Sequence, residues 1–352
     1  MDEEERTVGR RLRQIRKARG KSLRVLAGLS GMNRTTLSRI ERGERALDKR
    51  SEAVALANAL QISPRELLDL GSPSLPADPG TESAIDAIRD AIQASRVGVP
   101  DGQVQPVEQL RVRAQTVLVA KQACREEEVA ALLPTLIRDL HSSIDAGRDV
   151  AELLGLATVL YPQAVESWLV AVHAPGDLAW EAACMSRDAA QRLDQPVALG
   201  IATFGLTNAL LAEGNFALAR RLLDTTSETG DDQLDGMTAL TRCLLAASDS
   251  RPGDVAGPLE LAAELAARTG EGNAHYMSFG PSNVTLWRMS VALETGDHER
   301  AARLSDTVNL SALPPKRLTN YYVNRARGLS QIRRRCDEAV AALRAAERIS
   351  PD

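Results

Sequence analysis

The chain has 352 residues, of which 44% are apolar. This length exceeds the roughly 100–200 residues of one ordinary domain, so we expect two folded units. Aromatic residues make up only 3% of the chain, which argues against large stacking platforms, and the small net charge of −4 hides an asymmetry between the two ends.

Targeting and redox signals both point to the cytoplasm. The chain begins Met-Asp-Glu-Glu-Glu, whereas a secretory signal begins with positive charge followed by an apolar run. No stretch approaches the ~18 consecutive apolar residues of a membrane span. Cys124, Cys184, Cys243 and Cys336 lie singly, so we expect small buried hydrophobes rather than a disulfide scaffold or zinc ribbon. We therefore predict a cytoplasmic, nucleoid-associated protein with no membrane partner.

Positive charge is concentrated near the N-terminus. Residues 6–45 contain thirteen Lys and Arg but only two acids. Residues 1–70 hold sixteen basic and ten acidic residues, a net charge of +6, which leaves −10 for the rest. A solvated helix face would also carry charge, but so dense a basic segment favours a polyanionic partner for this part of the chain.

Apolar spacing and capping residues predict five short helices within this basic segment and just after it. Helical periodicity runs over 7–19, and Ser22 and Asn33 are suitable N-cap residues for helices over 22–29 and 34–41. A helix over 49–60 follows, and a Ser-Pro-Arg-Glu capping box opens a last helix over 64–70. Two short helices joined by a Gly-containing turn can place the second helix in the major groove of DNA.

The run from Ser22 to Gly43 reads Ser-Leu-Arg-Val-Leu-Ala-Gly-Leu-Ser-Gly-Met-Asn-Arg-Thr-Thr-Leu-Ser-Arg-Ile-Glu-Arg-Gly. It resembles the Cro/C1-type (Xre family) helix-turn-helix, and the similarity extends over about 8–70. The resemblance implies a five-helix DNA-binding domain, to which we assign residues 1–72. Where the family often has Gln, this chain has Leu23. In the family, that Gln helps to hold the recognition helix on DNA. We therefore expect Ser22 or Arg24 to make this DNA contact instead.

The predicted recognition helix carries polar side chains on one face. Arginine pairs bidentately with guanine, so Arg34 and Arg39 are predicted to read bases, and Thr35 and Ser38 to reach bases or phosphates. Flanking residues are predicted to hold the phosphate backbone: Lys21, Ser22, Arg24, Arg42 and Arg45. For each arginine, simple solvation is the alternative. The family resemblance implies a structural ion pair between Arg16 and Glu41 instead of DNA contact.

A segment rich in Pro, Gly and Ser separates the two predicted domains. We place the linker at 73–80 and the second domain at 81–352. Amphipathic helical periodicity recurs throughout that domain, and an alternating β pattern is nearly absent. The predicted fold class is therefore all-α: a five-helix head followed by a helical domain.

Short turns recur in the second domain at intervals of 38 to 43 residues. They are Gly176-Asp177, Gly214-Asn215, Gly253-Asp254, Gly296-Asp297 and, in the equivalent place, Arg334-Arg335. The pattern resembles tetratricopeptide (TPR) repeats, although its period exceeds the usual ~34 residues and most signature aromatics are missing. The resemblance implies a TPR-like α-solenoid over 149–352, with more degenerate helical pairs over 81–148. A non-repetitive helical bundle is the alternative.

Stacked helical pairs form a concave surface that binds peptides, proteins or small molecules. Counting back from each turn places five residues on that surface: Phe204, Asn208, Asn283, Tyr321 and Asn324. Asparagine can donate to and accept from an extended peptide backbone, and unliganded polar positions are the alternative. The segment 275–283 contains a Phe-Gly-Pro-x-Asn pattern that resembles actinobacterial Xre regulators. Helix entry at Pro281 would also explain it.

These features predict a sequence-specific transcriptional regulator. The sequence contains no Gly-rich phosphate loop or Gly-x-Ser-x-Gly, and its four histidines lie far apart, so we expect no enzyme, metal or cofactor. One recognition helix reads few base pairs, so we expect a homodimer on an inverted repeat of double-stranded DNA. The plan resembles peptide-sensing regulators of Gram-positive quorum sensing, which implies a peptide or small-molecule signal. The alternative is a DNA-tethered scaffold whose repeats bind a partner protein.

Overall fold

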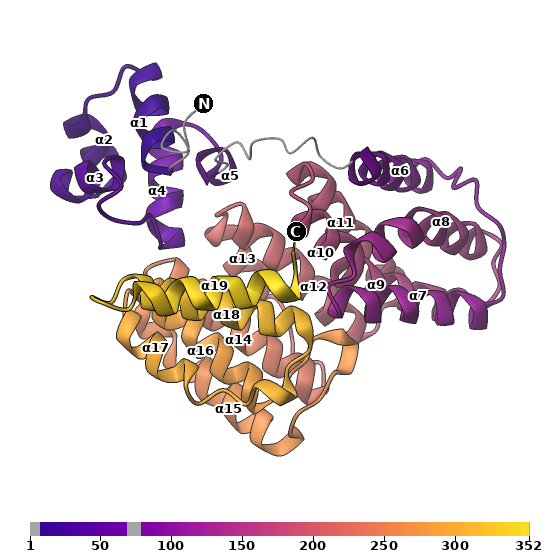
Figure 1. Ribbon diagram of the computed structural model, residues 1–352. Coiled ribbons are helices and arrows are strands. Elements are labelled where there is room, and N and C mark those ends of the chain that lie inside the picture. Colours follow the sequence, from indigo (N-terminus) through magenta and orange to yellow (C-terminus); the bar gives the residue numbers. More distant parts are fainter. Residues whose placement is uncertain (1–7, 69–78, 352) are drawn as a thin grey trace.

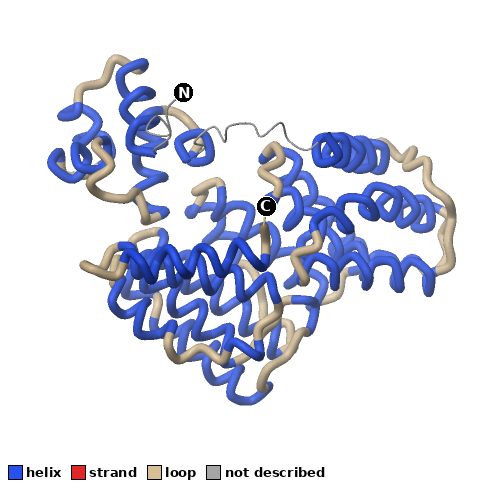
Figure 2. The backbone as a smooth tube through the Cα atoms, viewed as in Figure 1, coloured by secondary structure: helices blue, strands red, loops and turns tan. Residues whose placement is uncertain are grey.

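The computed structural model describes residues 8–68 and 79–351, and none of these residues lies in a β-strand. Helices joined by loops form a small N-terminal head and a larger, curved domain (Figure 2). The predicted all-α class is confirmed. Most of the predicted linker falls outside the described residues, and its last two positions already belong to a helix of the second domain.

The head contains the five predicted helices. They are α1 (Val8–Ala18), α2 (Leu23–Ser30), α3 (Arg34–Glu41), α4 (Arg50–Leu60) and α5 (Pro64–Leu68). The Ser22 hydroxyl caps α2 by accepting from the Val25 amide at 3.2 Å, and the Asn33 side chain caps α3 by accepting from the Thr35 amide at 2.8 Å. The head has its own core, in which Leu12, Leu26, Leu37, Leu56, Leu60 and Leu67 are fully buried.

The second domain, called the repeat domain below, starts with α6 (Pro79–Arg96), α7 (Val107–Gln122) and α8 (Glu126–Asp145). Next come α9 (Val150–Leu160), a π-helix (Tyr161–Glu166), α10 (Ser167–Ala171), α11 (Gly176–Leu193), α12 (Pro196–Ala212), α13 (Phe216–Asp224) and α14 (Asp232–Ser248). The domain ends with α15 (Ala256–Thr269), α16 (Pro281–Thr295), α17 (His298–Ser305), α18 (Pro315–Ser330) and α19 (Cys336–Ile349). Short 3₁₀ turns precede α15, α16 and α18.

Four of the five predicted turns lie between two helices that pack together: α12 and α13, α14 and α15, α16 and α17, and α18 and α19. The first, Gly176-Asp177, begins α11, which packs against α10. Successive first helices also contact one another, α12 with α14, α14 with α16 and α16 with α18. The stack curves far enough for α18 to contact α7 (Figure 1). Stacked helical hairpins therefore form the repeat domain.

One continuous helical stretch of the described residues, Val150–Ala171, is long and apolar enough to cross a membrane. Its mean hydropathy is 1.2, and 67% of the apolar window is buried inside the protein. Tyr161 and Trp168 from this stretch are among the largest fully buried side chains. The stretch therefore packs as a core helix of the repeat domain.

The segment before α16 closes on itself and packs against α14. The Gly272 amide donates to the Phe279 carbonyl at 2.8 Å, and α16 begins at Pro281. The Phe279 ring is fully buried against Gly236 of α14, where an added Cβ would lie 2.1 Å from Cζ of the ring. The Phe-Gly-Pro pattern thus encodes a loop anchored by one aromatic ring.

We predict that Gly236→Ala destabilises the repeat domain by about 1–3 kcal/mol, because the new methyl group overlaps the Phe279 ring. The control is Gly155→Ala in α9, where an added Cβ meets nothing within 4 Å. That change should be neutral or stabilising by up to ~1 kcal/mol, since alanine favours the helix. Urea unfolding followed by circular dichroism measures both, and equal midpoints for the two variants would contradict the prediction.

Candidate nucleic-acid interface

Helix α3 has a buried face and an exposed polar face. Leu37 and Ile40 face the core of the head and are buried. Arg34, Thr35 and Arg39 are exposed, and Ser38 is half-buried beside them. All four predicted base-reading residues thus lie on one short helix whose outer edge is available to a ligand.

A buried ion pair fixes α3 against α1. Arg16 Nε donates to Glu41 Oε1 at 2.6 Å, and Arg16 Nη2 donates to Glu41 Oε2 at 2.8 Å. Arg16 Nη1 also donates to the Lys21 carbonyl at 2.8 Å, so one guanidinium holds the end of α3 and the start of the turn before α2. The hydrogen bond that Arg16 donates to the Glu41 carboxylate raises the pKa of Arg16. The two residues that the family resemblance assigned to an ion pair are brought together here.

A close approach of backbones supports the same packing. Gly9 of α1 lies so near α3 that an added Cβ would be 2.0 Å from the Ile40 carbonyl oxygen. Sequence reasoning missed this glycine, because a glycine inside a helical pattern gives no sign of which backbone it touches. Gly9 and the Arg16–Glu41 pair together set the position of α3 in the head.

The residues predicted to contact phosphates differ in their exposure and in whether a carboxylate of the protein already pairs with them. Ser22 and Arg24 are exposed, and Lys21 is half-buried. Arg42 pairs with Glu44 at 2.8 Å on the surface, and Arg45 pairs with Glu52 at 2.7 Å in a half-buried position. A phosphate would have to compete with these carboxylates, so Lys21, Ser22 and Arg24 are the more available of the predicted residues.

The head contacts the repeat domain through a buried carboxylate at the end of α16. The side chain of Glu294 is 1% exposed and accepts from Arg50 Nη1 at 2.6 Å and from the Arg50 amide at 2.8 Å. Arg327 of α18 lies 3.7 Å from the same carboxylate and donates through Nη2 to the Asp48 carbonyl at 2.8 Å. We call these four residues the head–repeat interface.

A second contact lies on the turns between paired helices. Arg65 of α5 donates to the carbonyls of His173, at 2.7 Å, and Ala174 before α11. An added Cβ at Gly214, in the turn after α12, would lie 2.4 Å from a Val54 methyl group. The head is therefore docked by residues 48–65, while α3 lies at its outer edge (Figure 1).

The five residues predicted to line an accessible concave surface lie mostly inside the protein. Asn283 is fully buried and donates to Met237 Sδ at 3.4 Å, Phe204 is in the core around α12 to α16, and Tyr321 donates to the Ser305 carbonyl at 3.1 Å. Asn208 and Asn324 are half-buried and bonded within the protein, to the Phe204 carbonyl and Ser290 Oγ. Asn283, Phe204 and Tyr321 thus serve packing inside the protein, and a ligand surface that includes Asn208 and Asn324 stays a prediction.

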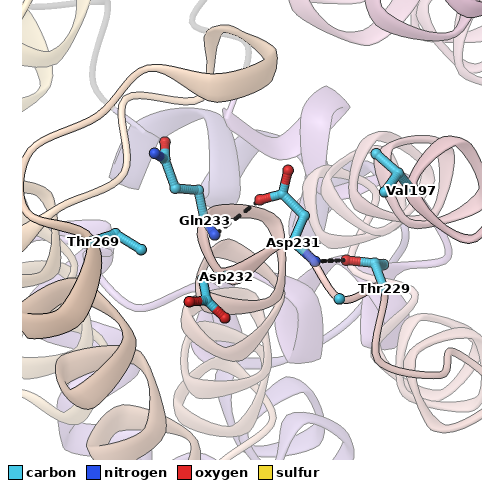
Figure 3. Close-up of a pocket in the computed structure, with 7 residues that line it drawn as sticks. Val197, Thr229, Asp231, Asp232, Gln233 and Thr269 are labelled. Atoms are coloured by element: carbon cyan, nitrogen blue, oxygen red, sulfur yellow. Dashed lines mark hydrogen bonds between the residues drawn. The ribbon is translucent and has the colours of Figure 1, made fainter.

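A shallow hollow opens at the start of α14. Its lining includes Thr229, Asp231, Asp232, Gln233 and Thr269, as Figure 3 shows. Asp231 caps α14 through the amides of Gln233 and Leu234 and also bonds to His275 Nε2 at 2.8 Å. Asp232 pairs with Arg268. The polar groups that line the hollow thus already bond to the start of α14, to Arg268 and to His275 in the loop before α16.

Within residues 8–68 and 79–351, no group of three or more His, Cys, Asp or Glu side chains could hold a metal ion.

Comparisons with known proteins agree with this geometry for the head. A family described as a helix-turn-helix domain matches residues 7–70, so the chain carries a helix-turn-helix domain. No curated protein matches the chain. Among solved structures, Bacillus thuringiensis PlcR in complex with the peptide PapR7 and DNA is similar at 14% identity and a TM-score of 0.38, covering 86% of this chain and 95% of that one.

We predict that Glu41→Gln destabilises the head by about 3–5 kcal/mol, because it leaves the buried Arg16 charge without its counter-ion. Glu44→Gln, which breaks the surface pair with Arg42, should cost less than about 1 kcal/mol. Hydrogen exchange followed by mass spectrometry on peptides within residues 8–41 measures both changes. Equal protection of these peptides in the two variants would show that the buried pair does not hold α3.

Proposed function

We propose that this protein is a DNA-binding transcriptional regulator whose helix α3 reads bases in the major groove. The observation that carries the proposal is the exposed row of Arg34, Thr35 and Arg39 on α3. The Arg16–Glu41 pair holds this helix against α1 on its buried side. Arginine in this position pairs with guanine O6 and N7. The matched helix-turn-helix domain and the basic charge of the head support the same function.

In this proposal, a homodimer binds an inverted repeat. A helix of eight residues, as α3 is, reaches only a few base pairs. Two heads on half-sites about one helical turn apart supply the missing specificity. Lys21, Ser22 and Arg24 hold the phosphates and set the register of each head.

The repeat domain controls the head in response to a peptide or small-molecule signal. A signal changes operator occupancy only if it binds one arrangement of head and repeat domain better than another. The head–repeat interface supports such a coupling, since charged residues from α4, α16 and α18 meet there. The activity proposed is regulatory and cytoplasmic, with no catalytic step.

Arg39→Ala should weaken binding to the selected operator by about 1–3 kcal/mol and relax the choice at one base pair. Arg24→Ala should weaken binding to operator and random duplexes alike and reduce the salt dependence, because a phosphate contact is lost. Fluorescence anisotropy with both duplexes at several salt concentrations separates the two effects. If both variants lost the same affinity on both duplexes, α3 would not be the base-reading element.

Glu294→Gln should loosen the docked head, because a buried carboxylate no longer faces Arg50 and Arg327, at a cost of roughly 2–5 kcal/mol. The matched control is Glu260→Gln on the exposed face of α15. Amide exchange within residues 48–56 should become faster in the first variant and stay unchanged in the second. Unchanged exchange in both would exclude this carboxylate as the link between the domains.

A further inference from the structure

Three cations from two distant parts of the chain lie near one another in the repeat domain. Lys121 lies near the end of α7, and Lys316 and Arg317 lie in the first turn of α18, which contacts α7. Lys316 Nζ donates to Ser167 Oγ at 2.5 Å, and Arg317 Nη2 donates to the Met277 carbonyl at 2.8 Å. We call Lys121, Lys316 and Arg317 the inner basic cluster.

The inner basic cluster carries more positive charge than its acidic partner in the protein neutralises. Lys121 is 3% exposed and pairs with Glu126 at 2.5 Å. Across the described residues, neither Lys316 nor Arg317 makes an ion pair within 4 Å, and their hydrogen bonds go to a neutral hydroxyl and a neutral carbonyl. Two cations thus lack a protein counter-ion.

The titratable groups around Lys316 supply little negative charge. Burial raises the pKa of Glu166 to about 8, so this nearby carboxyl is mainly protonated at neutral pH. Burial, then the charges of Lys121 and Arg317, lower the pKa of Lys316 to about 7, against an opposing effect of Glu126 and Cys124. Burial also lowers the pKa of Arg317 to about 10. An added anion would stabilise all three cations.

Stability alone does not explain this arrangement. Cations in the first turn of a helix face the positive end of the helix dipole, where acids are favoured. Lys316 and Arg317 nevertheless occupy that turn of α18, and both remain partly accessible to solvent. Ser167 directly follows the π-helix Tyr161–Glu166, and π-helical segments are frequent at functional sites.

We propose that the inner basic cluster binds an oxyanion, a carboxylate or phosphoryl group, of the signal received by the repeat domain. This inference rests on the proposed function, in which the repeat domain receives a signal. The Arg317 guanidinium offers a fork of donors to such a group, and the Lys316 ammonium supplies a second charge. A peptide C-terminus and a small organic acid or phosphate ester share this chemistry.

Helix α18 connects this cluster with the head. Arg317 and Arg327 are ten residues apart on α18, about 15 Å along a helix, and Arg327 contacts Asp48 of the head. An anion that draws the start of α18 towards α7 therefore acts on the helix that holds the head at its other end.

Lysine labelling of the full chain tests this proposal, with sulfate as the probe because its charge is constant near neutral pH. Lys316 is labelled with acetic anhydride at pH 7 and measured by mass spectrometry, with exposed Lys17 as the internal reference and chloride of equal ionic strength as the blank. Sulfate that raised the pKa of Lys316 by one unit would slow its labelling roughly fivefold, since the neutral fraction falls from about a half to about a tenth. Arg317→Gln should abolish this protection, and Arg303→Gln, on exposed α17, should keep it.

Sulfate that left Lys316 labelling unchanged, or protected it equally in Arg317→Gln, would overturn the proposal. If Arg317→Gln fails to fold, hydrogen exchange of α18 in the unaltered protein, with sulfate against chloride, decides instead: slower exchange supports the site and equal exchange overturns it. Peptide pools with free or amidated C-termini, and simple phosphate esters, then identify which source of the oxyanion protects Lys316. DNA selection by the same protein reports on the proposed function independently of either result.

Discussion

The carboxylate of Glu294 is the interaction on which the arrangement of the two domains depends. It is almost completely buried, and it accepts both the backbone amide and the guanidinium of Arg50 at the start of α4. A buried carboxylate is stable only with such partners. Because Arg327 of α18 lies beside it and holds Asp48, the position of the head is tied to the position of α18.

Different parts of the head contact the repeat domain and carry the exposed polar side chains of α3. Residues 48–65 contact the ends of helical pairs, whereas α3 and the start of α2 carry exposed side chains away from these contacts. The Arg16–Glu41 pair and the contact of Gly9 with α3 hold α3 against α1 within the head. A shift of α18 would therefore move the head as a body and leave the row of Arg34, Thr35 and Arg39 intact.

Local features could be predicted from the sequence, because their causes are local. Ser22 and Asn33 cap their helices through amides two or three residues away, and four of the five recurrent turns lie between two packed helices. Family resemblance also supplied the pairing of Arg16 with Glu41, which no spacing rule gives.

Long-range contacts could not be predicted in the same way. Glu294 and Arg50 are 244 residues apart, and Lys316 and Ser167 are 149 apart. Helical periodicity also misplaced Asn283, because it identifies a helix face but not which neighbour covers that face. Met237 of the preceding hairpin lies there. The pairs of Arg42 with Glu44 and of Arg45 with Glu52 were not predicted, because the sequence alone does not show which carboxylate each arginine meets.

The central claim, that α3 enters the major groove, is tested most directly by methylation interference on a duplex selected from random DNA by the purified protein. Methylation of guanine N7 modifies the major groove, and methylation of adenine N3 modifies the minor groove. We predict that N7 methylation at symmetric positions about one helical turn apart blocks binding, and that Arg39→Ala removes this interference at one guanine of each half-site. Interference confined to adenine N3, or an unchanged pattern with Arg39→Ala, would contradict the account.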